Sequence, residues 1–529
     1  MRRRTFLGSM VGATGILPVL TASRAAEERR VNRAGRRELS ADLVVVGGGL
    51  GGVAAALAAA RNGLRVILTE ETDWIGGQLT SQAVPPDEHQ WIETHGSTAS
   101  YRALRNGIRD FYRRNYPLRE SARKSAALNP GDGSVSRLCH EPRVALAVLE
   151  EMLAPYVSQG KLRLLLETQA VAAEVGNDSV RSVKVRDLRS GNERLLSAPF
   201  FIDATELGDL LPLTKMEFVM GAEGRGETGE LHAPEKRDAT NQQAFTMCFA
   251  VDYDPNGEHV IEKPKEYGFW RDFVPKLRPP WPGRLLSLTY THPATLQAKT
   301  LGFNPDGETA GTLNLWKYRR LISRRNFEAG AYAGDVSLVN WPQNDYLLGN
   351  LVGVSEREKA RNIERATQLS LSLLYWLQTE APRLDGKHGW PGLRLRGDLL
   401  GSEAGVAKYP YVREARRIRA EFTVLEQHVG IEARAKLLGI AEAETKAEVF
   451  GDSVGIGSYP IDLHPTSAGD NYIDFQTRPF QIPLGALIPA RVENLLGASK
   501  NIGTTHVTNG CYRLHPVEWN IGEAAGLVA

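Results

Sequence analysis

The hydrophobic pattern near residue 45 predicts a strand, a helix and a second strand in immediate succession. Leu43–Val46 is an apolar run with the length and composition of a buried strand. An alanine-rich segment, Val53–Arg61, follows with helical character and is closed by an Asn-Gly pair. A second strand-like run, Leu64–Thr69, ends in Glu70. This order predicts a βαβ unit, and therefore a parallel sheet.

Further along the chain the pattern switches repeatedly between helical and strand periods, which is typical of a mixed α/β protein. Helices are predicted over Ser100–Asn115, the apolar part of Ser134–Ala154, Ser355–Thr379, Tyr411–Val429 and Val517–Leu527. Strands are predicted over Leu162–Ala173, Ser179–Arg186, Leu195–Ala204, Phe245–Tyr253, Asp452–His464, Phe480–Ile488 and Asn494–Gly497. The chain shows no long-period repeat of the kind found in solenoids.

Three glycines, Gly47, Gly49 and Gly52, connect the first strand to its helix at G-x-G-x-x-G spacing. The first permits a tight turn, the second lets backbone approach a pyrophosphate, and the third lets helix and strand pack closely. The helix N-terminus offers free N–H groups to phosphates, and Glu70 can accept hydrogen bonds from ribose hydroxyls. Because strand, helix and acid all stand at the expected spacing, a dinucleotide site is favoured over a glycine-rich turn in an unrelated α/β unit.

Residues 1–39 are expected to be an export signal and a linker. Arg3 and Arg4 begin an R-R-x-F-L motif, a weakly apolar segment follows, and Ser23-Arg24-Ala25 places small residues where a signal peptidase reads. This is typical of a twin-arginine signal, although a basic disordered tail is the alternative. We therefore expect a periplasmic or secreted protein, with the twin-arginine translocase as its partner during export.

Composition excludes several classes. The chain is 42% hydrophobic and 24% charged, as in ordinary globular proteins, and no run is long enough to span a membrane. The net charge of +2 includes four arginines in residues 1–25, so the exported form would carry −2 and no nucleic-acid partner is expected. The three cysteines form no C-x-x-C, and the 11 histidines form no H-x-x-x-H or H-E-x-x-H, so neither a thiol redox pair nor a metal site is expected.

The stretches VVVGGGLGGVAAALAAARNG, VILTEE and IGGQLT resemble FAD-dependent oxidoreductases of the glutathione-reductase-like superfamily. The closest resemblance is to the "FAD dependent oxidoreductase" family found in many exported bacterial proteins. It implies the α/β fold class, with a Rossmann-like FAD-binding domain of three-layer ββα architecture split around a substrate domain that contains α+β elements. The FAD-binding domain would comprise residues 40–215 and 481–529. The substrate or cap domain, with helical insertions, would comprise residues 216–480.

The same resemblance implies where FAD binds. Gly76 and Gly77 would lie near the pyrophosphate and flavin, and the strand Thr168–Ala173 would contact the adenine. At the Ala204-Thr205 return, Glu206 replaces the glycine that is usual in the superfamily. The helix after Pro516 would point its N-terminus at the flavin N1/C2=O edge. The predicted cofactor residues are Gly47, Gly49, Leu50, Gly51, Gly52, Glu70, Glu71, Gly76, Gly77, Gln78, Val171, Ala204, Thr205 and Asn501.

The predicted catalytic residues lie between the last strand and the last helix, where the loop Gly503–Leu514 is expected to cover the flavin. Histidine suits a base that accepts a substrate proton, and His506 and His515 flank this loop. Asn509 and Arg513 complete the predicted set. A second rank of candidates, which no motif places, comprises His464, Asp462 and Arg413.

Other reactive or aromatic residues are expected to have mainly structural roles. Cys139 and His140 are neighbours in sequence, but packing is favoured over catalysis. The aromatic residues Trp281, Trp316, Trp341, Tyr409 and Tyr411 are expected mostly to pack in a core, with a sugar- or ring-stacking platform as the alternative.

The expected activity is removal of hydride from a small alcohol, sugar-like or amine substrate to flavin N5, followed by transfer of electrons to an acceptor that the sequence does not identify. The alternative is a non-catalytic flavoprotein that acts as an envelope binding or assembly factor. An NAD(P)H-dependent reductase is disfavoured because the chain has only one strong G-x-G-x-x-G motif.

Overall fold

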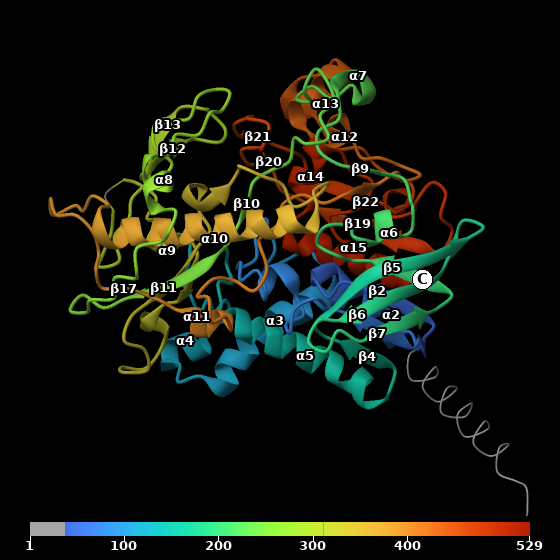
Figure 1. Cartoon of the computed structure of the whole chain (residues 1–529), viewed down its shortest axis with the longest axis horizontal. Helices are drawn as coiled ribbons and strands as arrows, with labels where there is room; N and C mark the ends of the chain where they lie inside the picture. The colour runs from blue at the N-terminus through green and yellow to red at the C-terminus, as the bar shows by residue number, and fades with distance from the viewer. Residues whose placement is uncertain (1–37, 310) are drawn as a thin grey trace, which may run out of the picture.

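The computed structural model describes residues 38–309 and 311–529 (Figure 1). The predicted twin-arginine signal lies outside the described residues. Within the described part of the chain, no helix is both long and apolar enough to cross a membrane.

A five-stranded parallel sheet, in the order β23-β8-β2-β3-β4, forms the first layer of the fold. Its strands are Leu495–Gly497 (β23), Phe200–Asp203 (β8), Leu43–Val46 (β2), Val66–Thr69 (β3) and Leu162–Leu165 (β4). Val46 pairs with both Thr69 and Asp203, so β2, β3 and β8 end at the same edge. In open α/β sheets this carboxyl edge is where ligands bind.

Two different layers cover the two faces of this sheet (Figure 1). On one side lie Leu50–Arg61 (α2), Ala99–Asn115 (α3), Pro142–Ser158 (α5) and His515–Val528 (α15). On the other side lies a sheet in the order β1-β7-β6-β5, formed by Glu38–Ser40, Glu193–Ser197, Ser179–Asp187 and Thr168–Gly176. The predicted three-layer ββα architecture is confirmed.

The alternation of side chains along β2 explains these layers. Successive residues of a strand point to opposite faces. Leu43 and Val45 therefore pack among the helices, whereas Val44 and Val46 pack against the second sheet. All four side chains are buried, which accounts for the uninterrupted apolar run in the sequence.

The last helix, α15, lies directly on the first one, α2. A Cβ atom added to Gly522 would lie 2.0 Å from the carbonyl oxygen of Gly51, and one added to Gly526 would lie 2.2 Å from that of Ala55. The small residues thus let two helix backbones approach closely. Consequently the C-terminal segment completes the layer that the N-terminal βαβ unit begins.

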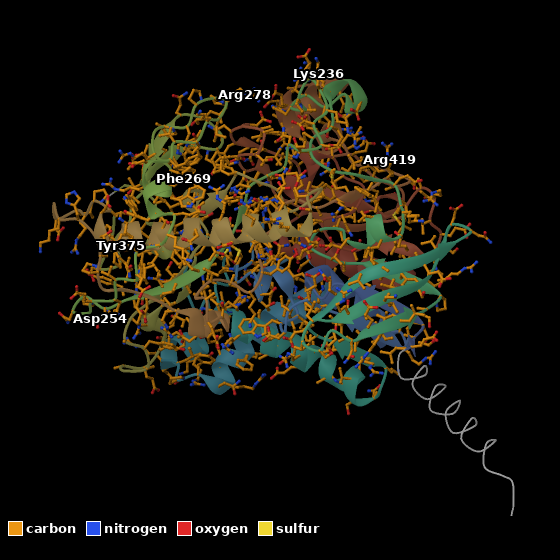
Figure 2. All side chains as sticks on the ribbon, viewed as in Figure 1. Lys236, Asp254, Phe269, Arg278, Tyr375 and Arg419 are labelled. Carbon is orange, nitrogen blue, oxygen red and sulfur yellow. The ribbon has the colours of Figure 1, made fainter. Side chains whose placement is uncertain are left out.

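A second core surrounds another sheet, in the order β14-β15-β11-β17. Its strands are Arg320–Ile322, Val336–Val339, Phe249–Tyr253 and Leu393–Leu395, and the long helix Glu356–Thr379 (α10) packs beside it (Figure 1). Trp281, Trp316 and Trp341 are buried in this core, as predicted for most of the aromatic residues. Figure 2 shows Phe269 and Tyr375 on the outer side of this core, on Tyr267–Asp272 (α8) and α10.

Shorter elements connect these layers. The further described helices are α4 (Glu120–Lys124), α6 (Leu210–Leu213), α7 (Arg225–Thr228), α9 (Leu315–Tyr318), α11 (Gly397–Leu400), α12 (Glu426–Val429), α13 (Ile431–Leu438) and α14 (His506–Tyr512). The further described strands are β9 (Phe218–Val219), β10 (Phe245–Thr246), β12 (Thr289–Thr291), β13 (Ala298–Thr300), β16 (Asp345–Tyr346), β18 (Arg417–Ile418), β19 (Ser453–Gly457), β20 (Ile461–Leu463), β21 (Ile473–Phe475) and β22 (Phe480–Pro483).

Several predictions of local structure were wrong. The runs 162–173, 195–204 and 452–464 are not single strands: each contains parts of two strands that belong to different sheets, namely β4 and β5, β7 and β8, and β19 and β20. The segment 411–429 is not a helix: Tyr411 exchanges backbone hydrogen bonds with Thr246, β18 pairs with β9, and α12 begins only at Glu426. Neighbouring strands satisfy this backbone, so tertiary contacts override its helical spacing. The predicted loop 503–514 contains α14, which begins after Thr505.

Candidate active site

The turn after β2 brings three backbone segments into close contact. Gly47 has φ of +100°, and a Cβ atom there would lie 2.3 Å from the carbonyl oxygen of Ala204. A Cβ atom on Gly52 would lie 1.9 Å from the carbonyl oxygen of Gly47. Gly49 is the N-cap of α2, and the Gly51 N–H in the first turn donates to Glu518 Oε1 at 3.3 Å. The positive end of the helix thus already attracts a buried carboxylate, as expected for a helix N-terminus.

A first cavity lies at the carboxyl edge of the parallel sheet. Its walls include these predicted cofactor residues: Gly47, Gly49, Glu70, Glu71, Gly77, Ala204 and Thr205. Thr168 and Ala170 of β5, the strand predicted to contact adenine, also line it. The remaining predicted cofactor residues do not line it: Leu50, Gly51, Gly52, Gly76, Gln78, Val171 and Asn501.

Several residues outside the wall fix its geometry. The Gly76 N–H donates to the carbonyl oxygen of Gly48 at 2.7 Å. The Asn501 side-chain amide donates to the carbonyl oxygen of Asp203 at 2.9 Å. The predicted segments therefore meet around one cavity although they lie far apart in sequence.

Glu70 stands at the end of β3, where its carboxylate faces the glycine turn. One oxygen accepts the Gly48 N–H at 3.0 Å. The other accepts both the N–H and the hydroxyl of Thr72, at 2.9 and 2.8 Å. Burial raises the pKa of Glu70 to about 7, against the effect of the Thr72 hydrogen bonds. Each oxygen retains acceptor capacity, as recognition of a ribose hydroxyl requires.

A buried charge cluster lies beside the glycine turn. Lys500 Nζ lies 2.5 Å from Glu206 Oε2 and 3.3 Å from Glu518 Oε2. Burial disfavours the charged form of Lys500, but Glu206 and Glu518 outweigh burial and raise its pKa. For Glu206, burial has the larger effect and raises the pKa, while Lys500 opposes it.

The Glu206 carboxylate occupies space over the turn. Its Oε1 atom lies 2.8 Å from the position of a Cβ atom on Gly49 and 2.6 Å from that of one on Gly77. Oε1 is also buried and has no hydrogen-bond partner among the described residues. A phosphate that reaches the α2 N-terminus must therefore displace the Glu206 side chain. Lys500 is the cation next to the place where the phosphate would replace this carboxylate.

A second cavity is lined by three buried arginines. Arg319 pairs with Asp87 at 3.1 Å, Arg413 pairs with Asp345 at 3.0 Å, and Arg513 pairs with Asp462 at 3.1 Å. Gln78 lies between Arg513 and the charge cluster, because its amide donates to the carbonyl oxygen of Arg513 at 3.0 Å and also contacts Glu518. The second cavity also adjoins the start of α15.

His464 lines the second cavity between two of these aspartates. Its Nδ1 lies 2.6 Å from Asp345 Oδ2, and its Nε2 lies 3.7 Å from Asp462 Oδ2. The pKa of Asp345 is lowered because Arg413 and His464 outweigh the effect of burial. An ionised Asp345 can only accept a hydrogen bond, so Nδ1 carries a proton, and Nε2 faces Asp462. This arrangement places the second ring nitrogen in the cavity wall, between the ring and the space that a ligand would occupy.

The structure separates the predicted catalytic residues. Arg513 lines the second cavity, whereas His506 lines a different one together with His232 and Asn241. Burial lowers the pKa of His506, but Glu414, 2.9 Å from its Nδ1, outweighs burial and raises it. Asn509 donates to the carbonyl oxygen of Arg413 at 2.7 Å and so positions that arginine.

His515 presents a donor in this structure. The backbone N–H of Asp87 donates to its Nδ1 at 3.0 Å, and burial lowers its pKa to about 4. A neutral ring that accepts at Nδ1 carries its proton on Nε2. Nε2 has no partner among the described residues, so it can donate to a ligand. The roles of His506 and His515 as bases stay predictions.

Cys139 and His140 behave as packing residues. The thiol is buried, which raises its pKa to about 12, and it is therefore a poor nucleophile. His140 Nδ1 contacts the carbonyl oxygen of Glu141 at 3.0 Å instead of the thiol. Within the described residues, no group of three potential ligands is arranged to hold a metal ion.

Sequence patterns did not point to Asp87, Arg319, Asn340 and Asp345. These residues meet around the second cavity from separate segments, and none lies in a recognisable motif. Pairing of arginines with aspartates far apart in sequence leaves no local pattern that could have identified them.

Comparison with known proteins identifies a family for this chain. A family model described as FAD dependent oxidoreductase matches residues 42–529. A comparison with curated proteins found no match. Among solved structures, THI4 of Thermovibrio ammonificans is 16% identical, with 39% of this chain and 76% of that chain covered and a TM-score of 0.22.

Two other solved structures are similar over comparable parts of the chain. For p-nitrophenol 4-monooxygenase from Pseudomonas putida the identity is 14%, 41% of this chain and 48% of that chain are covered, and the TM-score is 0.24. For a geranylgeranyl bacteriochlorophyll reductase-like protein from Thermoplasma acidophilum the identity is 16%, the coverages are 41% and 47%, and the TM-score is 0.22. This chain thus spans about half the length of each of these two proteins, and such distant likeness carries no argument about substrate.

Proposed function

The chain belongs to the FAD dependent oxidoreductase family, and on that premise we propose that it removes a hydride from a carbon bearing a hydroxyl or amino group in the second cavity. The protein is an FAD-dependent oxidoreductase. The observation that carries the proposed reaction is His464, held by Asp345 with its second nitrogen in the cavity wall, 3.7 Å from Asp462.

The first cavity fits the adenosine and pyrophosphate of FAD. Glu70 offers acceptors for the ribose hydroxyls, and the N-terminus of α2 would offer N–H groups to the phosphates. Lys500 would supply a positive charge once Glu206 has moved. Bound FAD supplies the hydride acceptor of the reaction.

The residues around the second cavity would orient the substrate and accept its proton. As the C–H bond breaks and hydride leaves with both electrons, the O–H or N–H proton passes to His464 Nε2, which yields a carbonyl or imine. Asp345 fixes the ring and stabilises its charged form. Arg513, held by Asp462, would anchor the substrate near the start of α15.

Flavin reduction in the absence of oxygen tests this proposal. Alcohols, sugars and amines are added to the purified yellow protein, and a substrate bleaches the flavin absorbance. His464→Asn should slow bleaching by about 10²–10⁴-fold without loss of FAD, because a general base contributes that much. The exposed His388 provides the control, His388→Asn. A His464→Asn protein with normal reduction rates would overturn the assignment of the base.

We further propose that the protein is exported through the twin-arginine pathway and belongs to the glutathione-reductase-like superfamily. The R-R-x-F-L motif supports export. The split parallel sheet, with its ββα layers, supports the superfamily placement. An exported flavoprotein that folds before translocation would acquire FAD in the cytoplasm.

A further inference from the structure

Six buried polar atoms around the second cavity have no hydrogen-bond partner among the described residues. They are the Nε atoms of Arg319, Arg413 and Arg513, the Asn340 amide nitrogen, Trp341 Nε1 and the Tyr472 hydroxyl. None of these residues is more than 8% exposed. A buried donor without a partner costs about 1–3 kcal/mol. So many around one cavity indicate a ligand that accepts several hydrogen bonds.

The charges around the cavity nearly cancel. Each of the three arginines already has an aspartate partner: Asp87, Asp345 or Asp462. A further acid, Asp474, lines the wall without a described basic partner. A negatively charged ligand would therefore meet no surplus of positive charge, and would approach carboxylates that repel it.

We propose that the second cavity binds a neutral polyhydroxylated molecule, such as a sugar or polyol, and that this molecule is the substrate. The inference rests on the proposed function. A hydroxyl both accepts and donates hydrogen bonds, so it can satisfy the orphaned N–H groups and also donate to Asp87, Asp462 or Asp474. An ammonium group only donates, and a carboxylate only accepts, so neither matches this wall.

The apolar part of the wall fits the same ligand. Tyr290, Tyr318, Tyr459 and Trp341 present aromatic rings to the cavity. Aromatic faces pack against the C–H groups of sugar rings, while their polar edges remain available for hydrogen bonds. The isoalloxazine ring of FAD accepts hydrogen bonds at its two carbonyls, N1 and N5 but donates only one, from N3–H, which is too few for the carboxylates of this wall.

Binding and reduction should be measured separately on the holoenzyme. Calorimetry without turnover reports binding of glucose, methyl glucoside, sorbitol, glucuronate and benzylamine. Bleaching of the flavin without oxygen reports oxidation of the same compounds. We expect at least one neutral polyol to bind and to bleach the flavin. Glucuronate and benzylamine should bind at least about 10-fold more weakly, the equivalent of 1.4 kcal/mol.

Matched substitutions test whether binding occurs in this cavity. Tyr472→Phe and Asn340→Ala should each weaken polyol binding about 5- to 100-fold, since each removes a hydrogen bond to the ligand. Tyr375→Phe is the control, because Tyr375 packs edge-on against Tyr267 at 4.7 Å on the outer side of the second core (Figure 2). Retained FAD content and an unchanged circular dichroism spectrum show that the variants are folded.

The two proposals can fail independently. If an amine or acid binds and bleaches the flavin while no polyol does, the substrate class is wrong and the oxidoreductase reaction stands. If polyols bind but none bleaches a flavin that dithionite still reduces, the cavity assignment stands and the proposed reaction fails. If no polyol binds, or if Tyr472→Phe and Tyr375→Phe bind equally well, the inference is overturned.

Discussion

Replacing Lys500 by methionine tests the charge cluster beside the glycine turn. The substitution keeps the length of the side chain but removes a cation that lies 2.5 Å from Glu206 and 3.3 Å from Glu518. Removing one partner from a buried ion pair costs about 3–5 kcal/mol, because the remaining charge is left unpaired. We therefore expect Lys500→Met to destabilise the apoprotein by about 4 kcal/mol at pH 7.5.

The loss should depend on pH in a defined direction. Burial already raises the pKa of Glu206, and removal of Lys500 raises it further. A group whose pKa is raised in the folded state destabilises the protein as pH rises through the interval between the unfolded and folded values. Part of the lost stability should therefore return as pH falls toward the ordinary pKa of a glutamate, because Glu206 then takes up a proton in the folded state. Lys500→Met/Glu206→Gln should recover more than 1 kcal/mol at pH 7.5 for the same reason.

Urea denaturation followed by tryptophan fluorescence measures these changes. With a slope of about 3 kcal/mol per molar, the midpoint of Lys500→Met should fall by about 1 M. Lys184→Met is the control, because Lys184 and Glu193 are 47% and 41% exposed and such pairs contribute less than about 1 kcal/mol. A midpoint within 0.3 M of wild type (about 1 kcal/mol at this slope), or a double variant no more stable than Lys500→Met, would refute the reasoning.

Three further predictions concern the cofactor, acid stability and export. Gly49→Val should fold but lose its yellow colour, because a side chain fills the turn, whereas Gly226→Val, in open space, should keep FAD; equal flavin absorbance would contradict this. Burial lowers the pKa of His515 to about 4, so the folded protein favours the neutral ring. The free energy of unfolding should therefore fall by about 3 kcal/mol as pH falls from 6.5 to 4. His515→Asn should lose less over that range in urea titrations, and an identical pH profile would exclude the effect. Replacing both Arg3 and Arg4 by lysine should leave the precursor in the cytoplasm on cell fractionation, and unimpaired export would disprove the twin-arginine assignment.

The sequence identified those parts of the fold that depend on local pattern. The patterns of a buried strand, an alanine-rich helix and a second strand predicted β2, α2 and β3. The close contact of α15 with α2 explains the small residues of α15. The segment 411–429 was mispredicted because its backbone hydrogen bonds come from distant strands such as β9. Helical spacing of apolar residues cannot report such partners.

The two cavities also differ in how far the sequence could predict them. The first cavity was largely predictable, because its glycines and Glu70 lie within one βαβ unit. The second was not, because Asp87, Arg319 and Asp345 are brought together only by the tertiary fold. Histidines near the last helix were preferred as bases from their position in the sequence, whereas His464 was given lower rank because no motif placed it. Its distinguishing feature, the contact with Asp345, exists only in three dimensions.

The position of β23 and α15 has a consequence for biosynthesis. In the parallel sheet β8 lies between β2 and β23, and α15 covers α2. When about the first 200 residues have left the ribosome, the sheet edge that β23 will cover and the face of α2 that α15 will cover are therefore still exposed. That apolar surface stays exposed while the ribosome adds about 300 more residues, a delay of roughly 15–60 s at bacterial elongation rates of 5–20 residues per second. The nascent chain is therefore expected to need a chaperone over this interval. Cofactor insertion should accordingly be post-translational, and chains that stall before β23 should be substrates for proteolysis.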